Sequence, residues 1–137
     1  MTVWLAGMRI TANRLNDHTV EATTTSGLTA ASGFTVNSFS GRKVNGVTTV
    51  HVYLLRTGGE IPTSGYVIGD NLADTAMATL PSGWRPPELI NAIVGDGNTD
   101  GEVTISAAGV ITLRSQFNKV VTDRNFRITA GWISGNS

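Results

Sequence analysis

The clearest signal in this chain is an alternation of apolar and polar residues with a period of two. Residues Asn125–Ile133 show it best, since Phe126, Ile128, Ala130 and Trp132 alternate with polar residues or glycine. Successive side chains of a β-strand point to opposite faces, so this segment is predicted to be a strand with one buried face. Few segments have the period of 3.6 residues that an amphipathic helix requires.

Similar patterns predict strands over much of the remaining chain, separated by residues that favour turns. The further segments are Thr19–Thr25, Phe34–Phe39, Arg42–Val44, Val47–Arg56, Tyr66–Gly69, Thr75–Leu80, Leu89–Val94, Glu102–Ser106 and Val110–Arg114. Asn45 and Gly46 give the strongest hairpin signal because both tolerate a positive φ, and Gly41 is expected to form another turn. About eight to ten short strands predict an all-β fold, an antiparallel, jelly-roll-like β-sandwich.

The strand predicted over Val47–Arg56 is apolar on both of its faces. One face carries Val50, Val52 and Leu54, and the other carries Val47, His51, Tyr53 and Leu55. A strand of this kind is either central in two stacked layers or packed against another subunit. We therefore predict that His51, Tyr53 and Leu55 contribute to a subunit interface.

The beginning of the chain differs from the rest, which suggests a segment of residues 1–18 followed by a β-sandwich domain of residues 19–137. Thr11 can cap a short helix over Ala12–Asn16, with Ile10 and Leu15 placed as a hydrophobic staple. So short a helix is not stable alone and must dock on something. We expect an attachment or oligomerisation segment that acts through Trp4, Leu5, Ile10 and Leu15. The alternative is a segment that only covers the end of the sandwich.

The charge balance limits the classes of partner. Ten basic and ten acidic residues give a formal net charge of zero, whereas nucleic-acid and polybasic membrane-surface binders need a basic excess. The absence of cysteine excludes disulfides and thiol chemistry. Neither a signal peptide nor an apolar run of about 18 residues is apparent, so we expect a cytoplasmically made protein that does not insert into membranes.

One loop has the spacing of a metal site. Asp96, Asn98 and Asp100 followed by Gly101 match the start of a D-x-N-x-D-G calcium loop. Position twelve of that motif falls on Ala107, where a bidentate glutamate is required. The favoured alternative is a polar hairpin loop in which these residues serve turn geometry. Calcium binding by Asp96–Asp100 is left open.

No combination of residues predicts catalysis. His18 and His51 lack the spacing of a metal site, and Asp17 and His18 have no nucleophile elbow that would complete a triad. Glycoside hydrolysis needs two carboxylates across a cleft, and nothing places any two of the candidates so. Those candidates are Asp70, Asp74, Glu88 and Glu102. We therefore expect no enzyme activity, no metal and no cofactor.

Exposed aromatic rings are the side chains on which sugars stack, so the three tryptophans bear on glycan binding. Trp132 follows the buried face of the last strand and is predicted to be core, and Trp84 lies between two proline corners. Neither is therefore assigned to binding. A bound glycan would be expected at a loop, for example Gly58–Gly65 or Asp96–Gly101.

The stretches IGDNLADTAMATLPSGWRPPELI and GEVTISAAGVITLR resemble the C-terminal β-sandwich of tailed-phage fibre and receptor-binding proteins. In that family an LPxGyRP-like corner with a structural aromatic residue precedes a hairpin of this pattern. The resemblance covers roughly Phe34 to Ile133. The opening VWLAGMRITANRLND also resembles tail-associated proteins of actinobacterial phages. The resemblance implies a virion structural protein, and such proteins are usually homotrimeric.

The sequence leaves three hypotheses for the function of this protein. The first is a trimeric tail- or head-fibre knob of a virion that mediates adsorption to the host cell surface. Its partners would be its own copies, other virion proteins bound through residues 1–18, and a host surface glycan, but no nucleic acid and no membrane. The second is a stand-alone carbohydrate-binding module, and the third is a capsular polysaccharide depolymerase.

Overall fold

The structure is a computed structural model, and it describes residues 6–7, 20–63 and 71–134 of the chain. Within these residues, nine strands form one antiparallel sheet in the order β1-β3-β4-β9-β6-β7-β8-β5-β2. The strands are β1 (Val20–Thr24), β2 (Thr29–Ala30), β3 (Phe34–Val44), β4 (Val47–Arg56), β5 (Asn71–Thr79), β6 (Ile90–Gly95), β7 (Asp100–Ile105), β8 (Val110–Gln116) and β9 (Asn125–Ile133). The prediction of an all-β antiparallel fold is confirmed.

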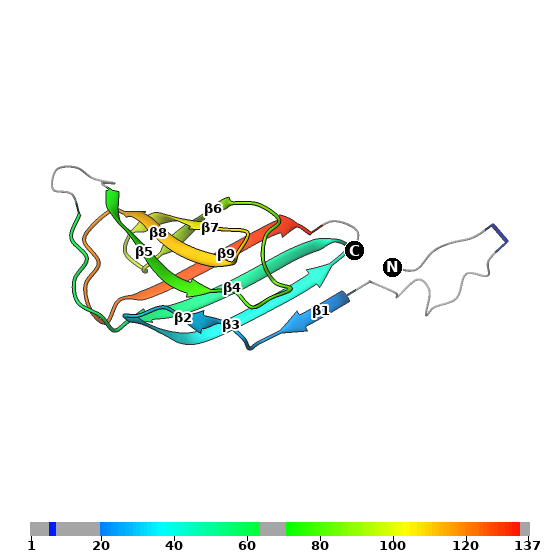
Figure 1. The fold of residues 1–137 in the computed structure, drawn as a ribbon, viewed down its shortest axis with the longest axis horizontal. Helices are drawn as coiled ribbons and strands as arrows, with labels where there is room; N and C mark the ends of the chain where they lie inside the picture. Colours follow the sequence, from blue (N-terminus) through cyan, green and yellow to red (C-terminus); the bar gives the residue numbers. More distant parts are fainter. Residues whose placement is uncertain (1–5, 8–19, 64–70, 135–137) are drawn as a thin grey trace.

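The sheet curls back on itself, so that its two halves lie on opposite sides of the core (Figure 1). One half contains β3, β4 and β9, and the other contains β6, β7, β8 and β5. The halves are joined where β6 pairs with β9 over only two residue pairs, Val94 with Ile128 and Gly95 with Arg127. The two layers expected from the sequence are therefore parts of one continuous sheet.

The core is built from the inward-facing residues of both halves. Phe126 and Phe34 meet edge to face, with 6.4 Å between ring centroids. The largest fully buried apolar side chains are Phe126, Leu54, Met77, Leu80, Ile105, Ile111, Leu113, Ile128, Val50, Val52 and Val94. Burying each such side chain contributes roughly 1.5–3 kcal/mol, so this set is the main source of stability.

The turn chemistry explains several boundaries. Asn45 and Gly46 have φ values of 51° and 77° between β3 and β4, as the Asn-Gly signal predicted. Gly109 has a φ of 86° in the β7–β8 turn, where its N–H donates to the carbonyl of Ser106 at 2.8 Å. Both β4 and β9 begin and end at the residues predicted from the alternation.

The predicted turn at Gly41 is wrong. β3 runs without interruption through Gly41, which pairs with Val50 of β4, and a bulge lies earlier, between Val36 and Ser38. β3 is therefore the longest strand with 11 residues, one more than β4. The glycine is explained by close packing: the ring of Trp84 occupies the space that a Cβ at this position would need.

The loop between β6 and β7 is shorter than expected. β7 begins at Asp100 instead of Glu102, because four residues suffice to turn the chain and the N–H of Asp96 donates to the carbonyl of Thr99 at 3.1 Å. The predicted helix Ala12–Asn16 and the predicted strand Tyr66–Gly69 lie outside the described residues. In the described part of the chain no helix is long and apolar enough to cross a membrane.

Candidate interaction surface

The outer face of β4 carries the residues that the sequence assigned to an interface. His51 is exposed, and Tyr53 and Leu55 are half-buried, while Val50, Val52 and Leu54 point into the core. The predicted division of β4 into two faces is confirmed. Trp4, Leu5, Ile10 and Leu15, the proposed attachment residues, lie outside the described residues.

Neighbouring strands position these outer side chains. The guanidinium of Arg127 on β9 lies 4.2 Å from the centroid of the Tyr53 ring, and Nδ1 of His51 is 3.1 Å from Oγ1 of Thr129. Both contacts join residues that are directly opposite each other in the β4–β9 register. β9 therefore holds both side chains on the outer face of the sheet, where the Arg127 guanidinium covers one side of the Tyr53 ring.

Apolar side chains extend this surface along the same two strands. Val47 pairs with Ile133 in the register, and they are 44% and 75% exposed. We define the β4–β9 face as Val47, His51, Tyr53, Leu55 and Ile133. Exposed apolar residues that gather on one face mark interaction surfaces more often than scattered ones do.

A cavity of about 530 Å³ overlaps this face over β1, β3 and β4, and Val47 and His51 belong to its lining. Hydroxyl groups dominate its polar lining, which also includes the Arg42 guanidinium and the His51 imidazole. The hydroxyl-bearing residues are Thr23, Thr24, Thr25, Ser40 and Thr49. The cavity therefore offers donors and acceptors with one permanent positive charge, a lining suited to a polar or anionic group. The Thr-rich edge strand was the only sequence signal for it.

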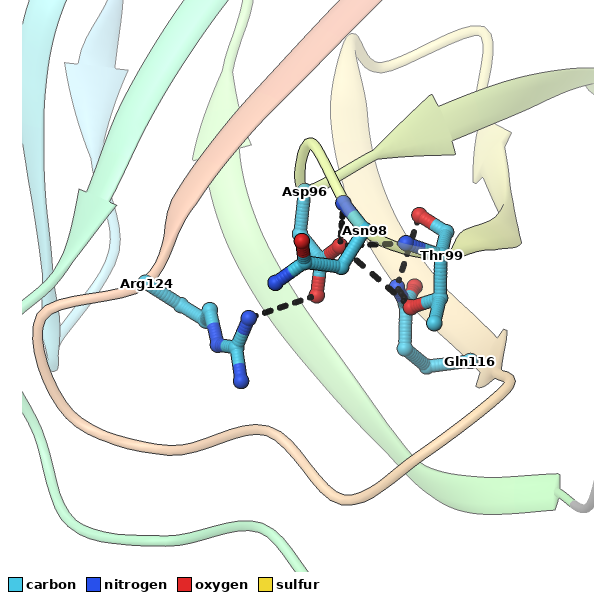
Figure 2. A network of polar contacts seen from close by, with 5 residues as sticks. All are labelled: Asp96, Asn98, Thr99, Gln116 and Arg124. Atoms are coloured by element: carbon cyan, nitrogen blue, oxygen red, sulfur yellow. Dashed lines mark hydrogen bonds and ion pairs between the residues drawn. The ribbon is translucent and has the colours of Figure 1, made fainter.

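The loop that resembles a calcium site is organised by hydrogen bonds within the protein. Oδ1 of Asp96 accepts from the backbone N–H of Asn98 at 2.9 Å and of Thr99 at 2.7 Å (Figure 2). Gln116 donates to Oγ1 of Thr99 at 2.7 Å, which ties the loop to β8. Oδ2 of Asp96 lies 3.7 Å from the Arg124 guanidinium. Asp96 thus serves turn geometry, as the alternative interpretation predicted.

These contacts also set the acidity of Asp96. Burial by itself would raise the pKa of the carboxyl. The backbone hydrogen bonds from Thr99 and Asn98, the charge of Arg124 and the Thr99 hydroxyl outweigh burial, so the pKa lies below its ordinary value of 3.8. The carboxylate is therefore ionised at neutral pH and forms part of the loop structure. Among the described residues, no three histidine or acidic side chains gather as a metal site.

The two described tryptophans have structural positions. Trp132 is buried and directly opposite Thr48, which confirms its prediction as a core residue. Trp84 is half-buried against the core in the corner between β5 and β6, and Nζ of Lys43 lies 4.9 Å from its ring centroid. Neither ring is presented as an open stacking platform.

The acidic candidates are dispersed. Asp74 forms an ion pair with Arg114 at 2.8 Å on the surface, and Glu102 accepts from Nδ2 of Asn91 at 2.6 Å. Glu88 is exposed in the corner, and Asp70 lies outside the described residues. The sequence missed a different pair, Asp100 and Glu102, which the alternation of β7 places on one face and which line the same hollow.

Two comparisons of the sequence with known proteins found no relative. No protein-family model matches the chain, and no curated protein matches its sequence.

Proposed function

We propose that this chain is a structural protein of a bacteriophage virion, the knob of a small homotrimeric tail or head fibre that adsorbs to the host cell surface. The resemblance of the Pro-rich corner and the following hairpin to phage fibre proteins supports the virion assignment. In the fold these two motifs become the β5–β6 connection and the β7–β8 hairpin. We further propose that the curled sheet is the jelly-roll-like β-sandwich of that class.

The observation that carries the oligomeric part of this proposal is the β4–β9 face. It combines two exposed aliphatic side chains with a histidine and a tyrosine that β9 holds in place. Burying such a face against further copies of the chain removes apolar surface from water at about 25 cal/mol per Å². A cyclic trimer that is closed through this face is therefore favourable, and the first 18 residues would remain for binding to other virion proteins.

A stand-alone carbohydrate-binding module is the second candidate, and the hydroxyl-rich cavity beside β1 favours it. That function predicts a monomer whose glycan affinity does not depend on residues 1–18. We propose a binding role over catalysis in either case, because two of the four acidic candidates, Asp74 and Glu102, are engaged by Arg114 and Asn91.

Three measurements test the proposed function. Light scattering on the purified full-length chain should give three times the chain mass of 14.4 kDa, and purified virions should contain its peptides. Added protein should also compete with phage adsorption to host cells. A monomer that neither occurs in virions nor competes for adsorption would contradict the fibre assignment and favour the binding module.

A further inference from the structure

Three adjacent hollows follow one another along the outer face of β6, β7 and β8, on the half of the sheet that does not contain β4. Their volumes are about 350, 360 and 330 Å³. The first two share Asn91, Glu102 and Ser115, and the second and third share Asp100. We define this continuous track as the β6–β8 groove.

Strand register explains why these residues share one face. Ile93 pairs with Glu102, and Glu102 pairs with Ser115, so the three form one row across the sheet. Asp100 lies two residues before Glu102, and Phe117 lies two residues after Ser115, on the same face. The N–H of Phe117 donates to the carbonyl of Asp100 at 3.2 Å, which brings the end of this row together.

Exposed apolar side chains accompany the groove along its length. Of the large hydrophobic residues that are exposed in the described part of the chain, Leu89, Ile93 and Phe117 line these hollows, at 61%, 72% and 40% exposure. Leu89 lies in the first hollow, Ile93 in the second and Phe117 in the third. Each hollow therefore has an apolar contact beside its polar groups.

The polar groups are arranged to accept hydrogen bonds. Nδ2 of Asn91 donates to Oε1 of Glu102 at 2.6 Å, which fixes both planar groups relative to each other. No other hydrogen bond to these side chains occurs within the described residues, so Oε2 of Glu102 and Oδ1 of Asn91 are available as acceptors. Asp100 adds a second carboxylate to the same hollow.

The charges select the class of ligand. The two carboxylates of the groove lie near one basic residue, Arg114, and its guanidinium is engaged by Asp74 at 2.8 Å. An anionic ligand would therefore be repelled, whereas a ligand that donates hydroxyl or amide protons would be bound. A peptide cannot add as a strand to β7 in the middle of the groove, because β7 already pairs with β6 on one side and with β8 on the other.

We propose that the β6–β8 groove binds a neutral oligosaccharide chain, including one that contains N-acetylated amino sugars, and this inference rests on the proposed adsorption function. Sugar hydroxyls donate to Glu102 and Asp100, and the apolar faces of successive rings lie against Leu89, Ile93 and Phe117. The succession of three hollows, each with an apolar and a polar side, matches the repeat of a linear glycan.

Calorimetric titration of the full chain with maltohexaose, N-acetylchitohexaose and an acidic galacturonate hexamer tests this assignment. At least one neutral hexamer should bind at least tenfold more tightly than the acidic one. Glu102→Gln and Ile93→Ser should each weaken that binding about tenfold. Glu88→Gln is the charge-matched control, since Glu88 is exposed outside the groove, and it should change affinity less than twofold.

Three results would overturn the proposal that the groove binds a neutral glycan. They are binding to neither neutral hexamer, tighter binding of the acidic hexamer, or unchanged affinity in both groove variants. The same variants, used as competitors of phage adsorption, separate this inference from the proposed function. If the unmodified protein and both groove variants compete equally, the fibre function stands and the assignment of glycan binding to the groove is wrong. If adsorption is lost after protease treatment of the host cells but not after periodate oxidation of their sugars, the receptor is a protein. The assignment of glycan binding to the groove is then also wrong.

Discussion

The indole ring of Trp84 lies against the backbone of Gly41, so that a Cβ at residue 41 would be 2.7 Å from Cε3 of the ring. This contact holds the Pro-rich corner between β5 and β6 on the inner face of β3. Lys43, two residues further along β3, places its ammonium group 4.9 Å from the centroid of the same ring. A glycine in the middle of the longest strand is thus required by packing and not by a turn.

Gly41→Ala should lower the free energy of unfolding by about 1–3 kcal/mol, because the added methyl group forces the Trp84 ring to move. Urea unfolding measures the change. Gly59→Ala is the matched control, since nothing lies within 4 Å of a Cβ at that position. Equal stability of the two variants would show that the corner is not packed on Gly41.

Gly101 and Gly95 should respond in opposite directions to the same substitution. A Cβ at Gly101 would overlap the carbonyl oxygen of Ser115, whereas one at Gly95 would meet only Oδ1 of Asp100 at 3.6 Å. We expect Gly101→Ala to destabilise the protein by at least about 2 kcal/mol. Gly95→Ala should stabilise it by about 0.4–1 kcal/mol, since it restricts the unfolded chain. Thermal unfolding monitored by circular dichroism would distinguish the two, and a stable Gly101→Ala would refute the close approach of β7 and β8.

Asp96 should make stability depend on acid pH. Its pKa is lower in the folded protein than its ordinary value of 3.8. The ionised Asp96 carboxylate therefore contributes fully to the free energy of unfolding above pH 3.8. This contribution is lost as the pH falls through the lower pKa of the folded protein. Asp96→Asn keeps an oxygen for the N–H groups of Asn98 and Thr99 but cannot titrate.

Between pH 6 and pH 2.5, the free energy of unfolding should consequently fall less steeply for Asp96→Asn than for the unmodified protein. Arg124→Met should give an intermediate slope, because the backbone hydrogen bonds remain. Guanidinium titrations at a series of pH values provide the data. Superimposable slopes for all three proteins would argue against the carboxylate network of Figure 2.

Arg56 is a buried cation held by neutral groups. Its Nε and Nη2 donate to the carbonyl of Gly59 at 3.0 and 2.8 Å, and its guanidinium lies 4.8 Å from the centroid of the Phe34 ring. Arg56→Lys should cost about 1–3 kcal/mol, because an ammonium group cannot reproduce both hydrogen bonds and the stacking. The exposed Arg42→Lys should remain within about 0.5 kcal/mol in the same urea titration. A tolerated Arg56→Lys would contradict this role.

Val47→Asp should dissociate the proposed trimer, because it places a charge in the apolar Val47–Ile133 pair at one end of the β4–β9 face. Light scattering should then give the mass of one chain, with an unchanged circular dichroism spectrum. Ile93→Asp serves as the control, since Ile93 is more exposed but lies on the other half of the sheet, and it should leave the mass of a trimer. Loss of the trimer in both variants, or in neither, would exclude the β4–β9 face as the interface.

Local sequence determined most of the strands. The alternation in β4 and β9 and the Asn45-Gly46 turn depend on neighbours within a few residues, so they were predicted to the residue. The inward and outward faces of β4 follow from the same period of two. His51, Tyr53 and Leu55 could therefore be assigned to one outer face before their partners were known.

Contacts between distant residues were decided only by the tertiary structure. Gly41 looks like a turn until Trp84, 43 residues later, is placed over it, and Asp100 looks like a loop residue until β7 pairs it with Gly95. The β6–β8 groove likewise needs three strands in register before Ile93, Glu102 and Ser115 form a row. The period of two predicts on which face of a strand a side chain lies. Strand pairing and the curling of the sheet determine which other side chains it contacts.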